Sequence, residues 1–195
     1  VGGGNPTGDF HAAIVLDRHT GEQVALAHTR GYEPRHFGML VAQLGTVYND
    51  ALAVVEANNH GIAVLDKLVE MNYRSIFTRR IVDSTTRQAV AKRGFWTDSK
   101  SKPTAVDLMV DLVNSGKVKI HDPIIYDEMF HYYWLREPRQ GSQGVGNENP
   151  DGHDDTLSAL FCACHGLQVS GFCDHVEEDD PIVERGESVE QMFFA

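Results

Sequence analysis

The stretch ALAVVEANNHG (residues 51–61) decides the fold, because it shows how the chain passes through a buried strand. Residues 51–56 are a short apolar run that ends at Glu56, and such a run is typical of a central strand covered on both faces. Asn and Gly residues then indicate a loop, and apolar residues at helical spacing follow it. Sites in open α/β sheets lie where strands end, so Glu56 is a candidate site residue.

Strand and helix patterns alternate on both sides of this stretch. Residues 10–17 and 22–31 are expected to form two strands joined by a Thr-Gly turn, and residues 34–50 a helix that begins with Pro. A hairpin followed by β/α alternation predicts an α/β fold with a mixed central sheet and helices on both faces. Downstream, we expect helices over 62–72, 103–116, 124–135 and 154–169, short strands over 74–80 and 117–122, irregular structure over 81–102, and a loop or exposed hairpin over 136–152.

Length and charge limit the domain organisation and the partners. A chain of 195 residues fits one domain, which we place at residues 1–170, and residues 171–195 are expected to be an acidic, mobile tail. The net charge of −11 argues against nucleic-acid binding by the protein as a whole. A basic segment over residues 74–102 nevertheless offers a local surface for a polyanion. No apolar run approaches the length of a membrane span, so no transmembrane helix is expected.

The cysteines indicate a reducing compartment. Cys162, Cys164 and Cys173 are an odd number clustered late in the chain, which fits a cytosolic protein better than a disulfide framework. The nearby His165 and His175 raise the alternative of a zinc-dependent enzyme. Residues two apart on a helix point to nearly opposite faces, so we favour small buried core residues over zinc ligands.

A pair of acids begins the last expected helix. Asp154 and Asp155 follow a Gly-rich loop and lie next to His153. One acid in a first turn commonly caps the helix or complements its dipole, whereas two adjacent acids repel each other unless a cation compensates them. Hard divalent cations take carboxylate, water and phosphate oxygens, and two such ions about 4 Å apart can clamp a phosphodiester during hydrolysis. The acids therefore favour a two-metal site.

Five motifs carry these acids and their neighbours along the chain: AVVEANNHG (53–61), GFWTDSKSKP (94–103), KVKIHD (117–122), IYDEMF (125–130) and GHDDTLSAL (152–160). In this order they resemble the nuclease domain of the large terminase subunits of tailed bacteriophages, over roughly residues 1–170. The resemblance implies an RNase H-like, RuvC-like fold and a Mg²⁺- or Mn²⁺-dependent endonuclease that cuts concatemeric viral DNA during packaging. Implied partners are double-stranded DNA, the packaging ATPase domain, the small terminase subunit and the portal protein, in the host cell cytoplasm. No GxxxxGK[ST] motif occurs, so the motor is not expected in this chain.

The resemblance also assigns roles to particular residues. Glu56 matches the family's second metal-binding acid and Asp155 the third, while Asp154 either binds the second metal or caps the helix. Asp9 and His153 are further metal-ligand candidates. In the family, the first acid ends a strand before the Gly-rich turn, so we expect that acid to precede the first residue of this chain.

DNA contacts are expected along the basic segment, at four residues: Lys100, Lys102, Arg79 and Arg80. Two alternatives remain for the function of such a domain. One is a catalytically silent RNase H-like module that docks DNA or a partner, motivated by the missing first acid and the acidic tail. The other is a Holliday-junction resolvase, which would cut four-way junctions selectively.

Overall fold

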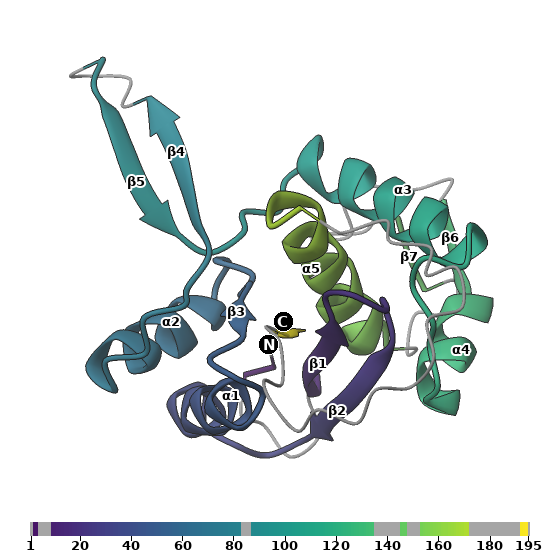
Figure 1. The fold of residues 1–195 in the computed structure, drawn as a ribbon, viewed down its shortest axis with the longest axis horizontal. Helices are drawn as coiled ribbons and strands as arrows, with labels where there is room; N and C mark the ends of the chain where they lie inside the picture. Colours follow the sequence, from purple (N-terminus) through teal and green to yellow (C-terminus); the bar gives the residue numbers. More distant parts are fainter. Residues whose placement is uncertain are drawn as a thin grey trace, which may run out of the picture.

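The structure, a computed structural model, describes residues 2–3, 9–82, 87–134, 145–147, 153–171 and 192–194. Its helices and strands alternate along the chain much as the sequence predicts (Figure 1). In chain order they are β1 (His11–Asp17), β2 (Gln23–Thr29), α1 (Pro34–Val47), β3 (Leu52–Ala53), α2 (Gly61–Glu70), β4 (Thr78–Val82), β5 (Ala89–Arg93), α3 (Ser101–Asn114), α4 (Pro123–Phe130), β6 (Tyr132–Trp134), β7 (Val145–Asn147), α5 (Asp155–Val169) and β8 (Met192–Phe194).

The main sheet is mixed, with the strand order β2-β1-β8-β3. β1 and β2 form the expected antiparallel hairpin, in which Ile14 lies opposite Leu26. β8 is antiparallel to β1 and parallel to β3. Isolated parallel bridges, one of which joins Glu56 to Phe95, continue the sheet beyond the short β3. The end of this strand region is therefore tied to the segment that precedes α3.

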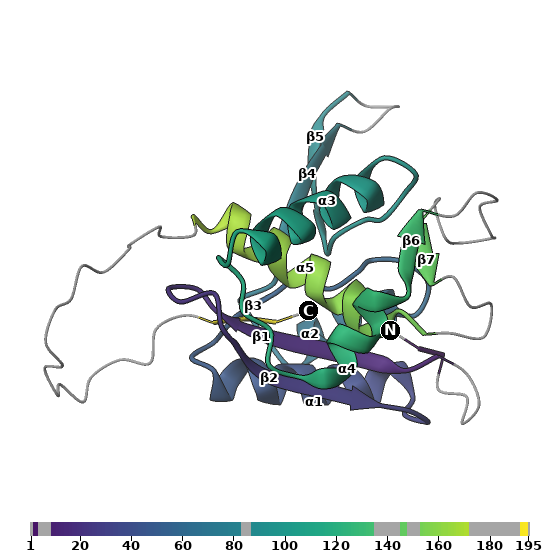
Figure 2. The same cartoon turned by 90° about the vertical axis from the view of Figure 1, so that its right-hand side faces the viewer.

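Helices cover both faces of the sheet (Figure 2). Because side chains alternate along a strand, β1 contributes to two separate cores. Ala12, Ile14 and Leu16 face the core that contains residues of α3, α4 and α5. Ala13 and Val15 face the core built with α1 and α2. The predicted mixed sheet with helices on both faces is confirmed.

A glycine allows α2 to begin directly behind the end of β3. A Cβ atom on Gly61 would lie 1.8 Å from the carbonyl oxygen of Glu56, so no larger residue fits without moving the backbone. At the other end of the domain, Gly116 has φ of +73° and follows α3, as the sequence predicts for a helix terminator. The first of these glycines sets the path of the chain around Glu56.

Three sequence predictions about local structure are wrong. Residues 81–102 are not irregular throughout, because β5 pairs with β4 in an antiparallel hairpin that projects from the body of the molecule (Figure 1). The side chains of β5 are all exposed, so no alternation of buried and exposed residues marks this strand in the sequence. The helix expected over 124–135 ends at Phe130, since β6 pairs antiparallel with the next strand of the chain, β7. Residues 117–122 contribute one isolated bridge, between Lys119 and Glu22, instead of a strand.

The expected acidic tail also contains a strand. β8 lies between β1 and β3, inside the main sheet, and so the region 171–195 is not a tail over its whole length. Strand pairing between the two ends of the chain leaves no local signal in the sequence, because the partner strands are more than a hundred residues away. Residues 172–191, with Cys173 and His175, lie outside the described residues.

Candidate functional site

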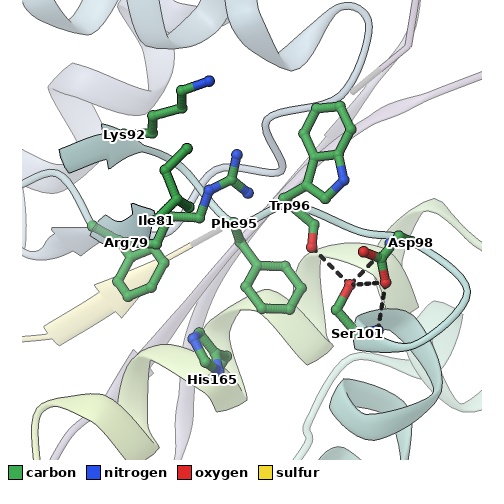
Figure 3. Close-up of a pocket in the computed structure, with 9 residues that line it drawn as sticks. Arg79, Ile81, Lys92, Phe95, Trp96, Asp98, Ser101 and His165 are labelled. Carbon is green, nitrogen blue, oxygen red and sulfur yellow. Dashed lines mark hydrogen bonds between the residues drawn. The ribbon is translucent and has the colours of Figure 1, made fainter. Parts of the chain in front are cut away.

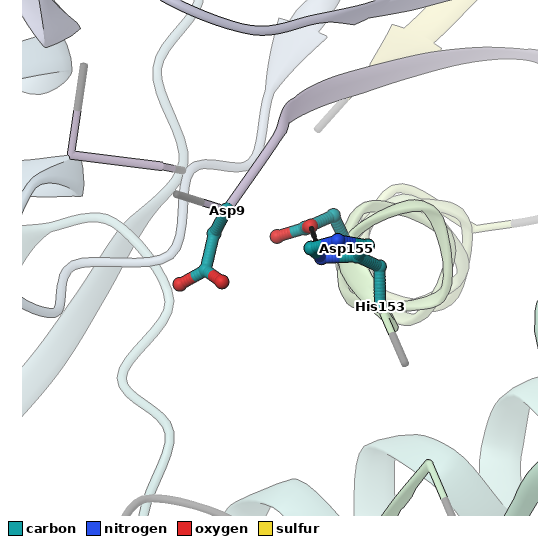
Figure 4. Close-up of side chains that lie close together, drawn as sticks. All are labelled: Asp9, His153 and Asp155. Atoms are coloured by element: carbon teal, nitrogen blue, oxygen red, sulfur yellow. Dashed lines mark ion pairs between the residues drawn. The ribbon is translucent and has the colours of Figure 1, made fainter. Parts of the chain in front are cut away.

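The sequence-predicted acids lie at the ends of three different elements. Asp9 comes just before β1, Glu56 follows β3, and Asp154 and Asp155 begin α5. Asp9, His153 and Asp155 each offer one ligand atom, and these atoms lie within 4.8 Å of one another (Figure 4). Residues separated by more than 140 positions in the sequence are therefore brought to one point by the packing of β1 against α5.

Asp155 is the most constrained of these acids. Its Oδ2 accepts a hydrogen bond of 3.0 Å from the backbone N–H of Phe10 and lies 3.6 Å from Nδ1 of His153. The side chain is 16% exposed. Burial raises the pKa of Asp155 to about 7, the hydrogen bond from Phe10 opposes this rise, and the negative charges of Asp9 and Asp154 add to it. A bound cation would remove much of this electrostatic cost.

His153 is oriented by an arginine. Nη2 of Arg30 lies 3.0 Å from Nε2 of His153, and its guanidinium lies 3.7 Å above the ring of Phe10. A guanidinium is only a donor, so Nε2 accepts and a neutral imidazole carries its proton on Nδ1, toward Asp155. His153 therefore lies between Arg30 and the acids near β1. Arg30 and Phe10 were missed in the sequence, because neither lies in a motif with the acids.

Asp154 faces the other acids and one lysine. It is the N-cap residue of α5, yet within the described residues its side chain makes no capping hydrogen bond. Burial raises the pKa of Asp154, and the charges of Asp9 and Glu56 raise it further, while Lys102 lowers it. Nζ of Lys102 lies 3.9 Å from Oδ2 of Asp154. The carboxylate of Asp154 is therefore influenced by the charge of Glu56 and by the charge of Asp9 near β1.

Glu56 is held by two polar side chains. The hydroxyl of Thr97 donates to Oε1 of Glu56, and Nδ2 of Asn58 lies 3.4 Å from the same oxygen. Asn58 also donates to the backbone carbonyl of Thr97, over 3.1 Å. The bridge between Glu56 and Phe95 brings Thr97 to this position. The motifs at 53–61 and 94–103 are thus joined in space, although the roles of Asn58 and Thr97 were not foreseen.

The donor set fits a hard divalent cation. The carboxylates of Asp9, Glu56, Asp154 and Asp155 come from three elements, and the charges of Asp9 and Glu56 raise the pKa of Asp154. Oxygen ligands of this kind suit Mg²⁺ or Mn²⁺, whereas thiolates suit zinc. Cys162 and Cys164 are buried free thiols, and no described group of metal-binding side chains includes them. Burial raises the pKa of Cys164 to about 12, which disfavours the thiolate that zinc requires.

The expected DNA-binding residues lie in three environments. Arg80 and Lys100 are exposed, and Arg79 is half-buried with its guanidinium 5.3 Å from the centre of the Trp96 ring. Lys102, by contrast, is 8% exposed, so it faces Asp154 and not open solvent. Arg79 lines a pocket of about 490 Å³ at the base of the β4–β5 hairpin, together with Lys92, Phe95, Trp96 and His165 (Figure 3).

Comparison with known proteins identifies a shared fold. No protein-family model and no curated protein sequence match the chain. Two crystal structures of the large terminase nuclease from thermophilic phage G20c, one with bound cobalt and one with bound magnesium, are similar to it. The TM-score is 0.60 in both comparisons, and the sequence identity is 21% for the cobalt structure and 19% for the magnesium structure. Each match covers 80% of this chain, together with 81% of the chain in the cobalt structure and 82% of the chain in the magnesium structure.

This chain has the fold of a phage large-terminase nuclease. The RNase H-like fold expected from the sequence is thereby confirmed. At this level of identity the likeness shows the fold alone. No helix in the described ranges has the length and apolar character that a bilayer crossing requires.

Proposed function

We propose that this chain is a metal-dependent DNA endonuclease domain of a phage packaging terminase. One observation carries the proposal: Asp9 and Asp155 lie together with His153, and the charge of Glu56 acts on the adjacent Asp154, on a fold shared with terminase nucleases that contain cobalt or magnesium. Asp9, Glu56, Asp154 and Asp155 supply the ligands, and two Mg²⁺ or Mn²⁺ ions are the cofactors. The substrate is the phosphodiester backbone of concatemeric DNA.

The side chains of the site prepare it to bind cations and phosphate. When bound, divalent cations polarise the scissile phosphate and lower the pKa of an attacking water. The backbone N–H of Phe10 fixes Asp155, and the hydroxyl of Thr97 fixes Glu56, so that neither carboxylate has to be ordered during binding. Lys102 places a buried positive charge beside Asp154 and so limits the repulsion among the acids.

The β4–β5 hairpin is the proposed DNA-facing surface. Arg79 lies directly opposite Lys92 in the hairpin register, and two like charges in this position destabilise a strand pair. A backbone phosphate beside Arg79 and Lys92 would compensate the two like charges. Contacts to phosphates give little sequence preference, which suits a packaging nuclease.

Plasmid cleavage tests the proposed activity. We expect the parent protein to nick and linearise plasmid DNA in Mg²⁺ or Mn²⁺, and the variants Glu56→Ala and Asp155→Ala to lose this activity. Asp107→Ala is the matched control, since it removes an exposed carboxylate from α3. Equal cleavage by the parent and both site variants would refute the assignment. Preference for a four-way junction over a duplex would identify a resolvase instead.

The packaging partners belong to the same proposal. The ATPase domain, the small terminase subunit and the portal protein are expected to bind this domain or the chain that carries it. Co-purification of the domain with each separately expressed partner measures this association.

A further inference from the structure

Glu128, on α4, is a buried acid outside the set of proposed metal ligands. It is 5% exposed, and its Oε2 accepts three hydrogen bonds from the first turn of α5. The donors are the backbone N–H of Thr156 at 2.9 Å, the hydroxyl of Thr156 at 2.6 Å, and the backbone N–H of Leu157 at 3.1 Å. Thr156 and Leu157 are themselves fully buried.

A helix needs acceptors for the N–H groups of its first turn, and an N-cap Asp is among the best suppliers. In α5 the Asp154 carboxylate makes no such bond within the described residues, and Glu128 takes its place from a neighbouring helix. A carboxylate at this helix end also complements the helix dipole. Because Glu128 caps α5, the carboxylates of Asp154 and Asp155 remain available to the site.

We propose that Glu128 is a positioning residue that keeps Asp154 and Asp155 directed toward the cations by capping α5 in their place. This inference rests on the proposed function of the site. Without the Glu128 carboxylate, two buried N–H groups need a new acceptor, and the nearest suitable group is the carboxylate of Asp154. Once Asp154 turns to cap its own helix, the site loses a ligand, and Mn²⁺ binding weakens although the fold persists.

Mn²⁺ titration by isothermal calorimetry tests this role in the metal-free protein. We expect Glu128→Ala to weaken Mn²⁺ binding at least tenfold. Glu128→Gln keeps an oxygen acceptor of the same reach and should bind Mn²⁺ within about threefold of the parent. Asp17→Ala is the control, because Asp17 also accepts backbone N–H bonds, from His19 and Thr20, but is the last residue of β1, at the opposite end of the strand from Asp9. It should lose stability without losing Mn²⁺ affinity.

Hydrogen exchange of the amides of Thr156 and Leu157 provides a second measurement that needs no metal. Exchange at one or both of these amides should accelerate in Glu128→Ala, because an N-cap Asp accepts from only one of the two N–H groups that Glu128 holds. The first turn of α5 in Glu128→Gln should stay protected. Should Glu128→Ala fail to fold, Glu128→Asp, whose carboxylate is one methylene too short, is expected to weaken Mn²⁺ binding severalfold.

Two results would overturn the inference. One is parental Mn²⁺ affinity in folded Glu128→Ala, and the other is unchanged exchange at Thr156 and Leu157 in that variant. A parent protein that binds no Mn²⁺ would instead refute the proposed metal site. In that case the exchange data alone decide whether Glu128 positions α5, so the two failures are distinguishable.

Discussion

Replacing Asp155 by Asn should stabilise the metal-free protein at neutral pH. Burial raises the pKa of Asp155 from 3.8 to about 7, so the folded state retains a proton between these values that the unfolded state releases. Stability therefore falls as pH rises across this window, because the folded state binds more protons. At about 1.4 kcal/mol per pKa unit, the cost reaches an upper limit of about 4 kcal/mol above pH 7. Asn keeps an oxygen to accept the Phe10 N–H bond but carries no charge.

Denaturant unfolding of the parent and Asp155→Asn, in EDTA and followed by tryptophan fluorescence, measures this effect. The two proteins should have similar stability at pH 4, and the variant should become progressively more stable than the parent toward pH 8. The comparison is needed because His11, His28 and His165 act in the opposite direction. Burial lowers the pKa values of these histidines, so the protein loses their contribution to its stability as pH falls.

Mn²⁺ should remove the difference at pH 8, since binding to the folded parent compensates the buried charge and the variant has lost a ligand. A stability gap that stays constant from pH 4 to pH 8 would refute the reasoning. It would mean that the Asp155 carboxylate ionises as easily in the folded protein as in the unfolded chain.

Three further predictions concern other parts of the molecule. Thr97→Val should leave Glu56 without its hydroxyl donor and lower the plasmid cleavage rate about tenfold for a stability change near 1 kcal/mol; an unchanged rate would show that Glu56 needs no such support. The double variant Arg79→Ala/Lys92→Ala should weaken binding to duplex DNA, and the slope of log Kd against log salt concentration should fall by about 2. A slope equal to that of the parent would exclude both residues as phosphate contacts. Cys164 should react with a thiol reagent only upon unfolding, and rapid reaction of the native protein would contradict its buried, protonated state.

Local patterns in the sequence were sufficient for much of the fold. The apolar run before Glu56, the Pro at the start of α1 and the Gly after α3 each act over a few residues, so their effect is visible without tertiary information. A strand was expected over 74–80, which overlaps β4, whereas β5 and β8 could not be predicted in this way. β5 has no buried face to impose an alternating pattern, and β8 depends on partners at the other end of the chain.

The sequence by itself singled out the candidate residues of the site. Glu56 at a strand end and the Asp154–Asp155 pair at a helix start are recognisable because acids in those positions cost free energy unless a cation or a cap compensates them.

Only the tertiary structure decided how these residues work together. It brings Asp9 next to Asp155, turns Lys102 toward Asp154 and places Glu128 at the first turn of α5. Each of these contacts joins elements that are distant in the sequence, and each depends on how β1, α3 and α4 pack against α5. Packing sets distances between side chains to within an ångström, and no local pattern of residues encodes such distances.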